Sequence, residues 1–467
     1  MEVTTAPAKK SKLALYIIIA LIAGIVLGFT LNKTYLADEN KKLSELDVTI
    51  EQVKTQMHGT TDSIALTPLQ AQKKSLSKER NAVLSAREHK VEPFSLLADI
   101  FLRLIKMIVA PLVFTTLVVG VAKLGDIKAV GRIGGKTLLW FIGASLMSLL
   151  LGMILVNFFQ PGIAMNLPLP DLTDESGITK TALSLKEFLY HVFPASVIES
   201  MAKNEILQIV VFSLFFGVGT AAIGEQGKIV IKAIDAIAHV ILKVTGYVMY
   251  IAPIAVFGAM TSIIAKQGLI ILKTYSIFIG EFYFGLLTLW ILLGVAGYLV
   301  VGKRIIQLLK RIKEPILLAF STSSSEAAFP KTMEELQGFG CKDKIVSFVL
   351  PLGYSFNLDG SMMYMTFASL FIAQSYGIDL PLGTQISMLL VLMLTSKGIA
   401  GVPRASLVVI AGTLSTFNIP EVGLALLLGI DPLLDMGRSA TNVVGNSVAT
   451  VVVSKWENAL ETPATVS

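Results

Sequence analysis

The chain has 467 residues, of which 54% are hydrophobic and 15% charged, and its mean hydropathy is +0.71. This balance exceeds that of soluble globular proteins, so the sequence predicts an integral membrane protein. The net charge of +6 then indicates membrane orientation rather than nucleic-acid binding, and the lone cysteine, Cys341, excludes an internal disulfide.

The first apolar run, residues 13–31, is uncharged and follows Lys9, Lys10 and Lys12. Its length suits a membrane-spanning helix. A cleaved signal peptide is the alternative, but the run is longer than a usual signal-peptide core and no small-x-small cleavage site follows it. We therefore expect a first span that starts in the cytoplasm.

Residues 32–92 carry mixed charges and follow this first span, so they are expected outside the cell. Apolar residues recur there at heptad-like spacing, with a turn expected at 59–68, which predicts an exposed helical hairpin. A solvated disordered loop is the alternative. The predicted seam consists of Leu36, Leu43, Leu46, Ile50, Val53, Met57, Leu69, Leu76 and Val83.

Further apolar segments long enough for spans or re-entrant pieces follow along the chain. They cover about 95–121, 137–159, 205–222, 229–265, 272–301, 345–374, 383–411 and 421–453. Residues 160–200 are polar and are expected outside. Basic clusters lie near the start of the chain, between the second and third spans, and at 303–313, which predicts that both termini are cytoplasmic.

The C-terminal third carries polar residues inside apolar runs. In two places a segment of small residues is followed by a polar-bearing span, a weak repeat of the kind that forms a transporter's midplane site. The four segments are "STSSSEAAFP" at 321–330, "NLDGS" at 357–361, "SKGIAGVP" at 396–403 and "DPLLDMGRSATNVVGN" at 431–446.

The last of these segments places six polar residues on one face of a helix. They are Asp431, Asp435, Arg438, Ser439, Asn442 and Asn446, and they share an arc of about 100° at ~100° per residue. A charge at mid-bilayer costs about 2.5–3.5 kcal/mol on insertion scales, so these groups are expected to face partners. A purely structural pair between Asp435 and Arg438 is the alternative.

"NLDGS" interrupts an apolar run, and Gly360 with the nearby Asn357 and Asp359 lets the backbone unwind and offer oxygen ligands to a sodium ion. A polar kink packed against a neighbour is the alternative. "STSSSEAAFP" and "SKGIAGVP" are interpreted as re-entrant tips, whose helix N-termini suit a carboxylate. An ordinary loop is the alternative for each tip taken alone.

At these residues the chain resembles the glutamate transporter family, the dicarboxylate/amino acid:cation symporters. The likeness runs from about 94 to 457 and includes "QPG" at 160–162, both tips, the Asn-x-Asp-Gly-Ser motif and "LDMGRSATNVVGN". The resemblance implies an all-α membrane protein with eight transmembrane helices and two re-entrant helical hairpins. It further implies a homotrimer, in which a scaffold of the first, second, fourth and fifth spans holds an elevator-type transport domain gated by the second hairpin.

The implied division of the chain assigns every segment to a tail, the scaffold, the transport domain or the insertion. It reads 1–31, N-terminal tail and first span; 32–92, extracellular hairpin insertion; 93–136, second span; 137–160, third span; 161–270, outer loop with the fourth and fifth spans; 271–455, sixth to eighth spans with both hairpins; and 456–467, cytoplasmic tail.

The resemblance also implies a substrate site. Arg438 would pair with a side-chain carboxylate and Asp435 with an amino group, as the chemistry of guanidinium and carboxylate groups suggests. The other expected substrate ligands are Ser324, Ser325, Ser361, Val402, Ser439 and Asn442. Because Asp435 suits an ammonium, L-glutamate or L-aspartate is favoured over C4-dicarboxylates, and cystine remains an alternative within the family.

The coupling cation is expected to be sodium, a proton, or both. Candidate sodium ligands, several through carbonyls, are Asn357, Asp359, Ser396, Lys397, Ile399, Asn442 and Asn446. Sodium-driven relatives carry aspartate at the Asn446 position, and their Thr-Ser pair becomes Ala144-Ser145 here, which favours proton coupling. Glu326 is the candidate proton carrier.

The sequence thus predicts a secondary active symporter for acidic amino acids in the inner membrane, surrounded by lipid. An anion-conducting channel is the alternative from another class, although a channel needs a continuous polar path. No nucleophile-base pair or metal cluster is recognisable, so neither an enzyme nor a cofactor is expected.

Overall fold

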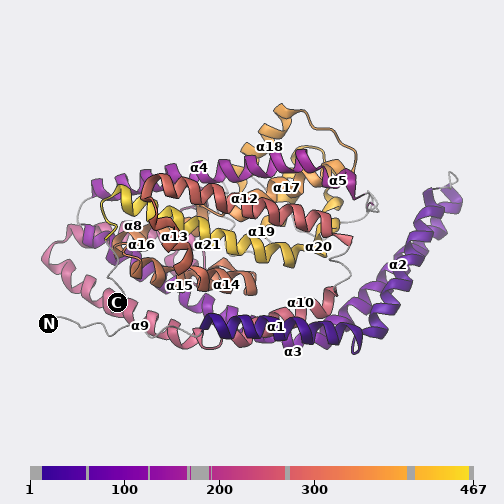
Figure 1. Cartoon of the computed structure of the whole chain (residues 1–467), viewed down its shortest axis with the longest axis horizontal. Helices are drawn as coiled ribbons and strands as arrows, with labels where there is room; N and C mark the ends of the chain where they lie inside the picture. The colour runs from indigo at the N-terminus through magenta and orange to yellow at the C-terminus, as the bar shows by residue number, and fades with distance from the viewer. Residues whose placement is uncertain are drawn as a thin grey trace.

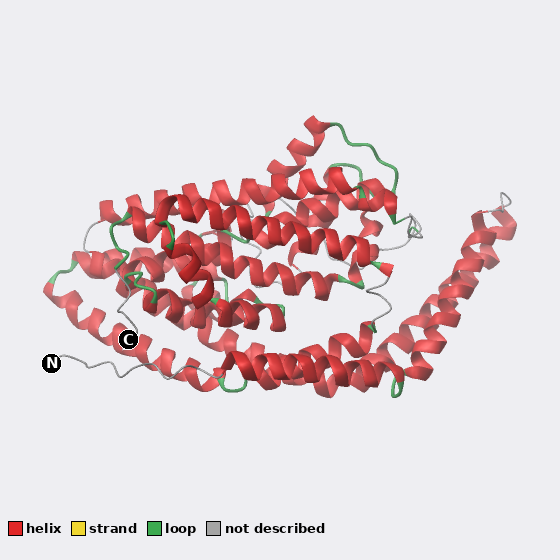
Figure 2. Cartoon of the chain, in the orientation of Figure 1, coloured by secondary structure: helices red, strands yellow, loops and turns green. Residues whose placement is uncertain are grey.

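The computed structural model describes residues 13–58, 63–124, 127–165, 169, 189–190, 192–268, 274–396 and 405–461. Helices dominate these residues, and Figure 2 shows them as an elongated bundle with one arm projecting from it. Extended pairing in the described part is limited to an isolated bridge between Cys341 and Leu460. The predicted all-α class is confirmed.

The helices, labelled as in Figure 1, fall into long spans and shorter broken pieces. They are α1 (Leu13–Lys33), α2 (Ala37–His58), α3 (Ser63–Leu124), α4 (Ile127–Phe159), α5 (Pro161–Ala164), α7 (Val197–Lys203), α8 (Ile206–Ala222), α9 (Glu225–Met249), α10 (Ala252–Gln267), α12 (Ser276–Val301), α13 (Arg304–Arg311), α14 (Lys313–Thr322), α15 (Ser325–Gly338), α16 (Asp343–Phe356), α17 (Asp359–Ser375), α18 (Leu382–Thr395), α19 (Ala405–Thr416), the 3-10 helix η1 (Glu421–Leu424), α20 (Ala425–Leu428) and α21 (Asp431–Trp456).

Four described helices are long and apolar enough to cross a membrane: α1, the apolar part of α3, α4 and α12. The pair α9 and α10, bent by 50°, raises the number to five if it counts as one span. The other predicted spans are short, interrupted, or carry charges as α21 does. The count of eight spans therefore remains a prediction, because length and composition alone do not recognise broken spans.

α1 and α10 pack closely because two glycines one turn apart face the partner helix. A Cβ on Gly24 would lie 2.8 Å from the Phe257 carbonyl oxygen, and one on Gly28 would lie 2.7 Å from the Thr261 carbonyl oxygen. On its other side, α10 approaches α3 through Gly258, whose added Cβ would collide with the Phe94 carbonyl oxygen. Small residues let helices approach to this distance in a membrane.

The 32–92 segment contains α2 and the first part of α3, which lie antiparallel and form the projecting arm in Figure 1. Its apolar contacts come from the heptad-like seam, with Leu43, Leu46 and Val83 buried together. Interhelical ion pairs flank that seam, with Lys42 Nζ 2.9 Å from Glu79 Oε1 and Arg80 Nε 2.5 Å from Asp47 Oδ1.

The base of this arm is fixed to the membrane helices. Leu36, Val91 and Ala265 are fully buried against one another, and Asn32 Nδ2 donates to the Ala265 carbonyl oxygen at 2.8 Å. Lys90 Nζ lies 2.5 Å from Glu39 Oε1, and this hydrogen bond lowers the pKa of the Glu39 carboxyl. The Glu39–Lys90 ion pair therefore stabilises the base of the arm when the pH is above the ordinary carboxyl pKa. This stabilisation is lost only as the pH falls through the lowered pKa of Glu39.

α3 differs from the prediction in two places: at its start, where a turn was expected, and at the boundary between the arm and the second predicted span. Pro68 lies inside the helix, so the turn expected over 59–68 is shorter than predicted at its second end; residues 59–62 are outside the described part. The helix then continues from the arm through the second predicted span without interruption. A proline inside a helix removes one backbone hydrogen bond, yet α3 continues past Pro68, Pro93 and Pro111.

Replacing a seam residue by a charge should separate the two helices of the arm. We expect Leu46→Asp, at a side chain that is 8% exposed, to cost about 2–4 kcal/mol locally. Hydrogen exchange across α2 should then become faster, while Val48→Asp, at a 56% exposed side chain of the same helix, should leave it unchanged. Equal exchange in the two variants would contradict the seam.

Candidate substrate and cation site

The helix predicted to unwind at "NLDGS" is interrupted there. α16 ends at Phe356 and α17 begins at Asp359, and Asn357 and Leu358 between them have non-helical dihedral angles. Such a break frees backbone carbonyls and amides inside an otherwise apolar bundle, where they need polar partners.

A buried polar cluster surrounds this break. Asn357 Nδ2 donates to Asp359 Oδ2 at 2.9 Å and to Asn446 Oδ1 at 3.2 Å, and Ser148 Oγ donates to Asp359 Oδ1 at 3.4 Å. Asn357 Oδ1 and Asn446 Nδ2 are buried without a hydrogen-bond partner. An unsatisfied buried oxygen beside a carboxylate fits a small hard cation.

Two glycines make room for this cluster. A Cβ added to Gly445 would overlap Asp359 Oδ2, and one added to Gly353 would overlap Asn446 Oδ1. Asn357, Asp359 and Asn446, predicted from sequence as cation ligands, are thereby brought together. Ser145, expected there from the resemblance, donates to the Phe356 carbonyl oxygen at 3.4 Å.

Ser148 is a residue that sequence reasoning missed. It lies three positions after Ser145, which puts the two hydroxyls on the same face of α4. This helical spacing was the available signal, but only the packing of α4 on α17 shows that Asp359 is the partner.

Asn442 joins the cluster to the start of α17. Its Oδ1 accepts the backbone N–H groups of Gly360 at 3.0 Å and Ser361 at 3.4 Å, and its Nδ2 donates to Ser361 Oγ at 3.3 Å. The side-chain oxygen of Asn442 therefore caps the broken helix. Ser439, one turn earlier on α21, is buried at 4% exposure.

Arg438 is the buried cation of the same α21 face. Its Nη2 lies 2.9 Å from Asp435 Oδ1 and 3.1 Å from Asp431 Oδ1, and its guanidinium lies 4.1 Å from the ring centre of Tyr364. Tyr364 Oη donates to Asp431 Oδ1 at 3.3 Å. Nε and Nη1 of Arg438 are buried without a hydrogen-bond partner, so the guanidinium retains donors for a further carboxylate.

Asp431 and Tyr364 were not predicted as partners of Arg438. Asp431 was recognised only as one of the six polar residues on one helix face. Tyr364 lies on α17, and nothing in the sequence around it indicates a contact with Arg438.

α12 holds α21 in place from another side, since Trp290 Nε1 donates to Thr441 Oγ1 at 2.8 Å and Tyr283 Oη donates to the Leu433 carbonyl oxygen at 2.6 Å.

The first hairpin consists of α14 and α15, which pack against α21. The 10 residues of α14 extend about 15 Å, half of a bilayer core, as a re-entrant arm requires. At the tip, Ser323 has a left-handed backbone with φ 50°, and its Oγ lies 3.5 Å from the Pro432 carbonyl oxygen. The tip thus lies beside the start of α21.

The serines of this tip have distinct positions. Ser324 is the N-cap of α15, and its Oγ accepts the Ala327 N–H at 3.2 Å. Ser325 and Glu326 occupy the first turn of α15 and are partly buried. A carboxylate in a first turn is favoured by the helix dipole.

The second hairpin is described only in its arms, α18 and α19. Ser396 ends the first arm, is 2% exposed, and donates from Oγ to the Met393 carbonyl oxygen at 3.0 Å. Lys397, Ile399 and Val402, predicted as site residues, lie outside the described residues.

The "QPG" motif ends α4 and begins α5. Gln160 adopts a left-handed backbone with φ 52°, and Pro161 starts the short helix. Gly162 packs against the end of α17, where its N–H donates to Gln374 Oε1 at 3.3 Å and a Cβ would lie 2.5 Å from the Phe371 carbonyl oxygen. The motif therefore fixes the distance between α4 and α17.

The sequence matches the sodium:dicarboxylate symporter family over residues 13–456. The chain belongs to this family. It is 45% identical to the proton/sodium-glutamate symport protein of Geobacillus stearothermophilus, over 77% of this chain and 87% of that protein. It is 43% identical to the C4-dicarboxylate transport protein of Laribacter hongkongensis, over 78% of this chain and 84% of that protein, and 41% identical to that of Bacillus subtilis, over 78% and 87%.

Membership in the sodium:dicarboxylate symporter family establishes the general activity. The chain is a multi-pass membrane transporter of the dicarboxylate or glutamate symporter class, and it is not an enzyme. Relatives of similar identity carry different substrate names, so the substrate is a matter for the residues of the site itself.

Adding a methyl group at Gly445, next to the Asp359 carboxylate, should disrupt the polar cluster around Asp359. We expect Gly445→Ala to lower the midpoint of thermal unfolding by several degrees and to abolish any stabilisation by sodium ions, because the new methyl group displaces the Asp359 carboxylate. Gly143→Ala on α4, where an added Cβ has no neighbour within 4 Å, is the matched control. An unchanged sodium response in Gly445→Ala would exclude this cluster as a cation site.

Proposed function

We propose that the protein is a secondary active symporter that takes up L-glutamate or L-aspartate together with protons, sodium ions or both. The observation that carries this proposal is the buried Arg438, which pairs with Asp435 yet keeps unpaired donors at Nε and Nη1. A planar guanidinium with a free edge suits a carboxylate, and an aspartate beside it suits an ammonium group.

The charges around Arg438 favour an amino acid over a C4-dicarboxylate. One guanidinium and two aspartates, Asp431 and Asp435, give this group a net charge of −1. A dicarboxylate adds two negative charges and nothing for Asp435 to bind, whereas an acidic amino acid also brings an ammonium. Like charges brought together in a buried site are costly, so the amino acid is the better match.

The cation cluster offers one carboxylate, Asp359, with neutral Asn357 and Asn446 beside it. A site with fewer carboxylates binds sodium more weakly, which favours a proton as at least one coupling ion. Glu326, in the first turn at the hairpin tip, is our candidate carrier of that proton. Carbonyls after Ser396 are candidates for a further sodium site.

The transport cycle is proposed to follow the elevator pattern of the resemblance. α1, α3 and the region 161–270 would form the scaffold of a homotrimer, and α4 with the region 271–455 would move across the lipid bilayer with the substrate. The second hairpin, α18 and α19, would act as the gate. In this proposal both termini lie on the cytoplasmic side of the cell's inner membrane.

Uptake by reconstituted vesicles tests this function. We expect labelled aspartate to accumulate against its gradient when a proton or sodium gradient is imposed, with the two gradients varied independently. Accumulation driven by protons alone would support Glu326 or another carboxylate as carrier. Strictly downhill flux would instead favour an anion-conducting channel, and uptake of succinate but not aspartate would favour a C4-dicarboxylate carrier.

Arg438→Ala should reduce aspartate uptake at least about a hundredfold, because a buried charge-assisted pair to a substrate carboxylate is worth about 3 kcal/mol or more. Arg80→Ala, which removes an exposed arginine of the projecting arm, should leave uptake unchanged. Retained aspartate affinity in Arg438→Ala would refute the assigned role.

Asp435→Asn should reduce selection for the ammonium group. We expect aspartate and glutamate to lose affinity relative to succinate, measured as competition against labelled substrate, because the neutral amide no longer attracts the cation. Unaltered glutamate transport in Asp435→Asn would count against this assignment while leaving the role of Arg438 intact.

A further inference from the structure

Residues 457–461 follow α21 and run along the cytoplasmic base of the first hairpin; we call them the strap. The strap pairs with the turn that connects α15 to α16. Glu461 N–H donates to the Gly340 carbonyl oxygen at 2.8 Å, Lys342 N–H donates to the Ala459 carbonyl oxygen at 3.0 Å, and Cys341 and Leu460 form an antiparallel bridge.

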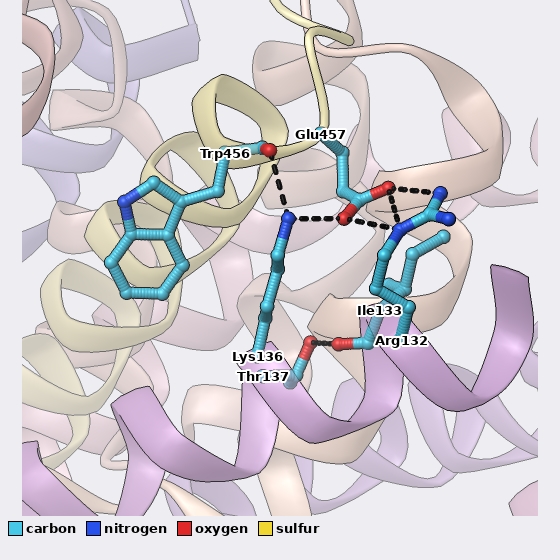
Figure 3. A network of polar contacts seen from close by, with 6 residues as sticks. All are labelled: Arg132, Ile133, Lys136, Thr137, Trp456 and Glu457. Carbon is cyan, nitrogen blue, oxygen red and sulfur yellow. Dashed lines mark hydrogen bonds and ion pairs between the residues drawn. The ribbon is translucent and has the colours of Figure 1, made fainter.

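One end of the strap is held by α4 (Figure 3). Arg132 donates to both oxygens of Glu457, with Nη2 2.8 Å from Oε2, and Lys136 Nζ lies 2.6 Å from Oε1. Lys136 Nζ also donates to the Trp456 carbonyl oxygen at 2.9 Å. The Glu457 side chain is 5% exposed, whereas Arg132 is 57% and Lys136 34% exposed, so two cations at the surface cover one nearly buried carboxylate.

The other end of the strap is held by α13. Arg304 Nη2 donates to the Glu461 carbonyl oxygen at 2.7 Å and to the Phe339 carbonyl oxygen at 3.2 Å, and its guanidinium lies 5.0 Å from the Phe339 ring centre. One arginine thus joins the strap to the end of the first hairpin. Gly340 at φ 105° allows this contact, because a Cβ there would lie 2.6 Å from the Glu461 carbonyl oxygen.

The hairpin that the strap contacts is itself tied together at its base. Lys331 on α15 lies 3.5 Å from Glu314 on α14, and it pairs with Glu335 at 3.0 Å. Arg311, on the preceding helix α13, pairs with the same Glu335 at 2.9 Å. These ion pairs join α13, α14 and α15, and the strap connects them to α4 and α21.

We propose that the strap is a latch that holds the cytoplasmic base of the first hairpin against α4 and α21, so that this hairpin stays closed toward the cytoplasm throughout transport. The functional part rests on the proposed symport. Without the latch, the hairpin opens on the cytoplasmic side and substrate escapes independently of the coupling cation.

The latch holds across the physiological pH range. The Arg132 and Lys136 hydrogen bonds lower the pKa of the Glu457 carboxyl below its ordinary value. The ionised Glu457 carboxylate therefore stabilises the strap fully when the pH is above 4.5, the ordinary pKa. This stabilisation is lost only as the pH falls through the lowered pKa. Proton coupling near neutral pH therefore does not release the strap.

Cys341 is a natural reporter of strap release. Its side chain is 3% exposed, lies in one apolar cluster with Ala459 of the strap, and has a thiol whose pKa burial raises to about 11. Because the thiolate is the reactive form, both features slow alkylation at neutral pH. The chain has a single cysteine, so labelling by N-ethylmaleimide reports this position alone.

The experiment compares Cys341 labelling at pH 7 in full-length protein reconstituted into vesicles. Glu457→Ala removes the clamp at one end, and Gly340→Ala places a methyl group against Glu461 at the other. Both should label at least about tenfold faster than the unmodified protein, which corresponds to a latch weakened by ~1.4 kcal/mol, through lost charge-assisted contacts in Glu457→Ala and through a steric clash in Gly340→Ala. Both should also show increased downhill leak of aspartate and reduced uphill accumulation.

The controls match each variant. Glu225→Ala removes a carboxylate that pairs with Lys228 at the surface, and Gly224→Ala introduces a methyl group at φ 59° with no neighbour within 4 Å. Both should label at the unmodified rate. Saturating aspartate should leave the labelling rate of the unmodified protein unchanged, because the latch stays closed through the cycle.

Three outcomes would overturn the latch. Unchanged labelling in both strap variants, with unfolding midpoints showing that they are folded, would exclude a strap that covers Cys341. Faster labelling with unaltered coupling would exclude its control of the hairpin, and substrate-dependent labelling would exclude a latch that stays closed. Labelling is measured without transport. If the proposed symport is wrong, the labelling rates still test whether the strap shields Cys341.

Discussion

A guanidinium that is 2% exposed inside an apolar helix bundle is the constraint on which the site depends. Arg438 is tolerated there because Asp431 and Asp435 neutralise it and Tyr364 covers its face. Removing both aspartates would leave an uncompensated buried charge, which costs several kcal/mol. The positions of α17 and α21 relative to each other are therefore set partly by this one side chain.

The same two helices carry the polar cluster around Asp359, the candidate cation site, and Asn442 joins this cluster to the surroundings of Arg438. Its side chain caps the start of α17, while Asp359 at that start lies against Gly445 on α21. A shift of α17 would thus alter both the surroundings of Arg438 and those of Asp359. If Arg438 and Asp359 bind the substrate and the cation as proposed, this shared helix start joins the two sites directly.

Much of the fold was predictable because its signals are local. Apolar runs located the long helices, and small or polar residues located the break at Asn357 and the tip at Ser323. The partners of these residues were harder to predict, since Ser148 meets Asp359 and Tyr364 meets Arg438 only through packing of distant segments. The continuity of α3 was missed because a proline and a change from polar to apolar composition resemble a boundary, although neither ends a helix that is supported on its flanks.

The 62 residues of α3 form one helix of about 93 Å, from the tip of the projecting arm to the far side of the apolar bundle. The arm is fixed at its base by Leu36, Val91 and Ala265, which pack against one another and join it to α10. A fluorophore or antibody fragment attached to the arm would therefore report the frame of α1, α3 and α10. Such a probe provides an external reference axis against which displacement of the other helices is measurable.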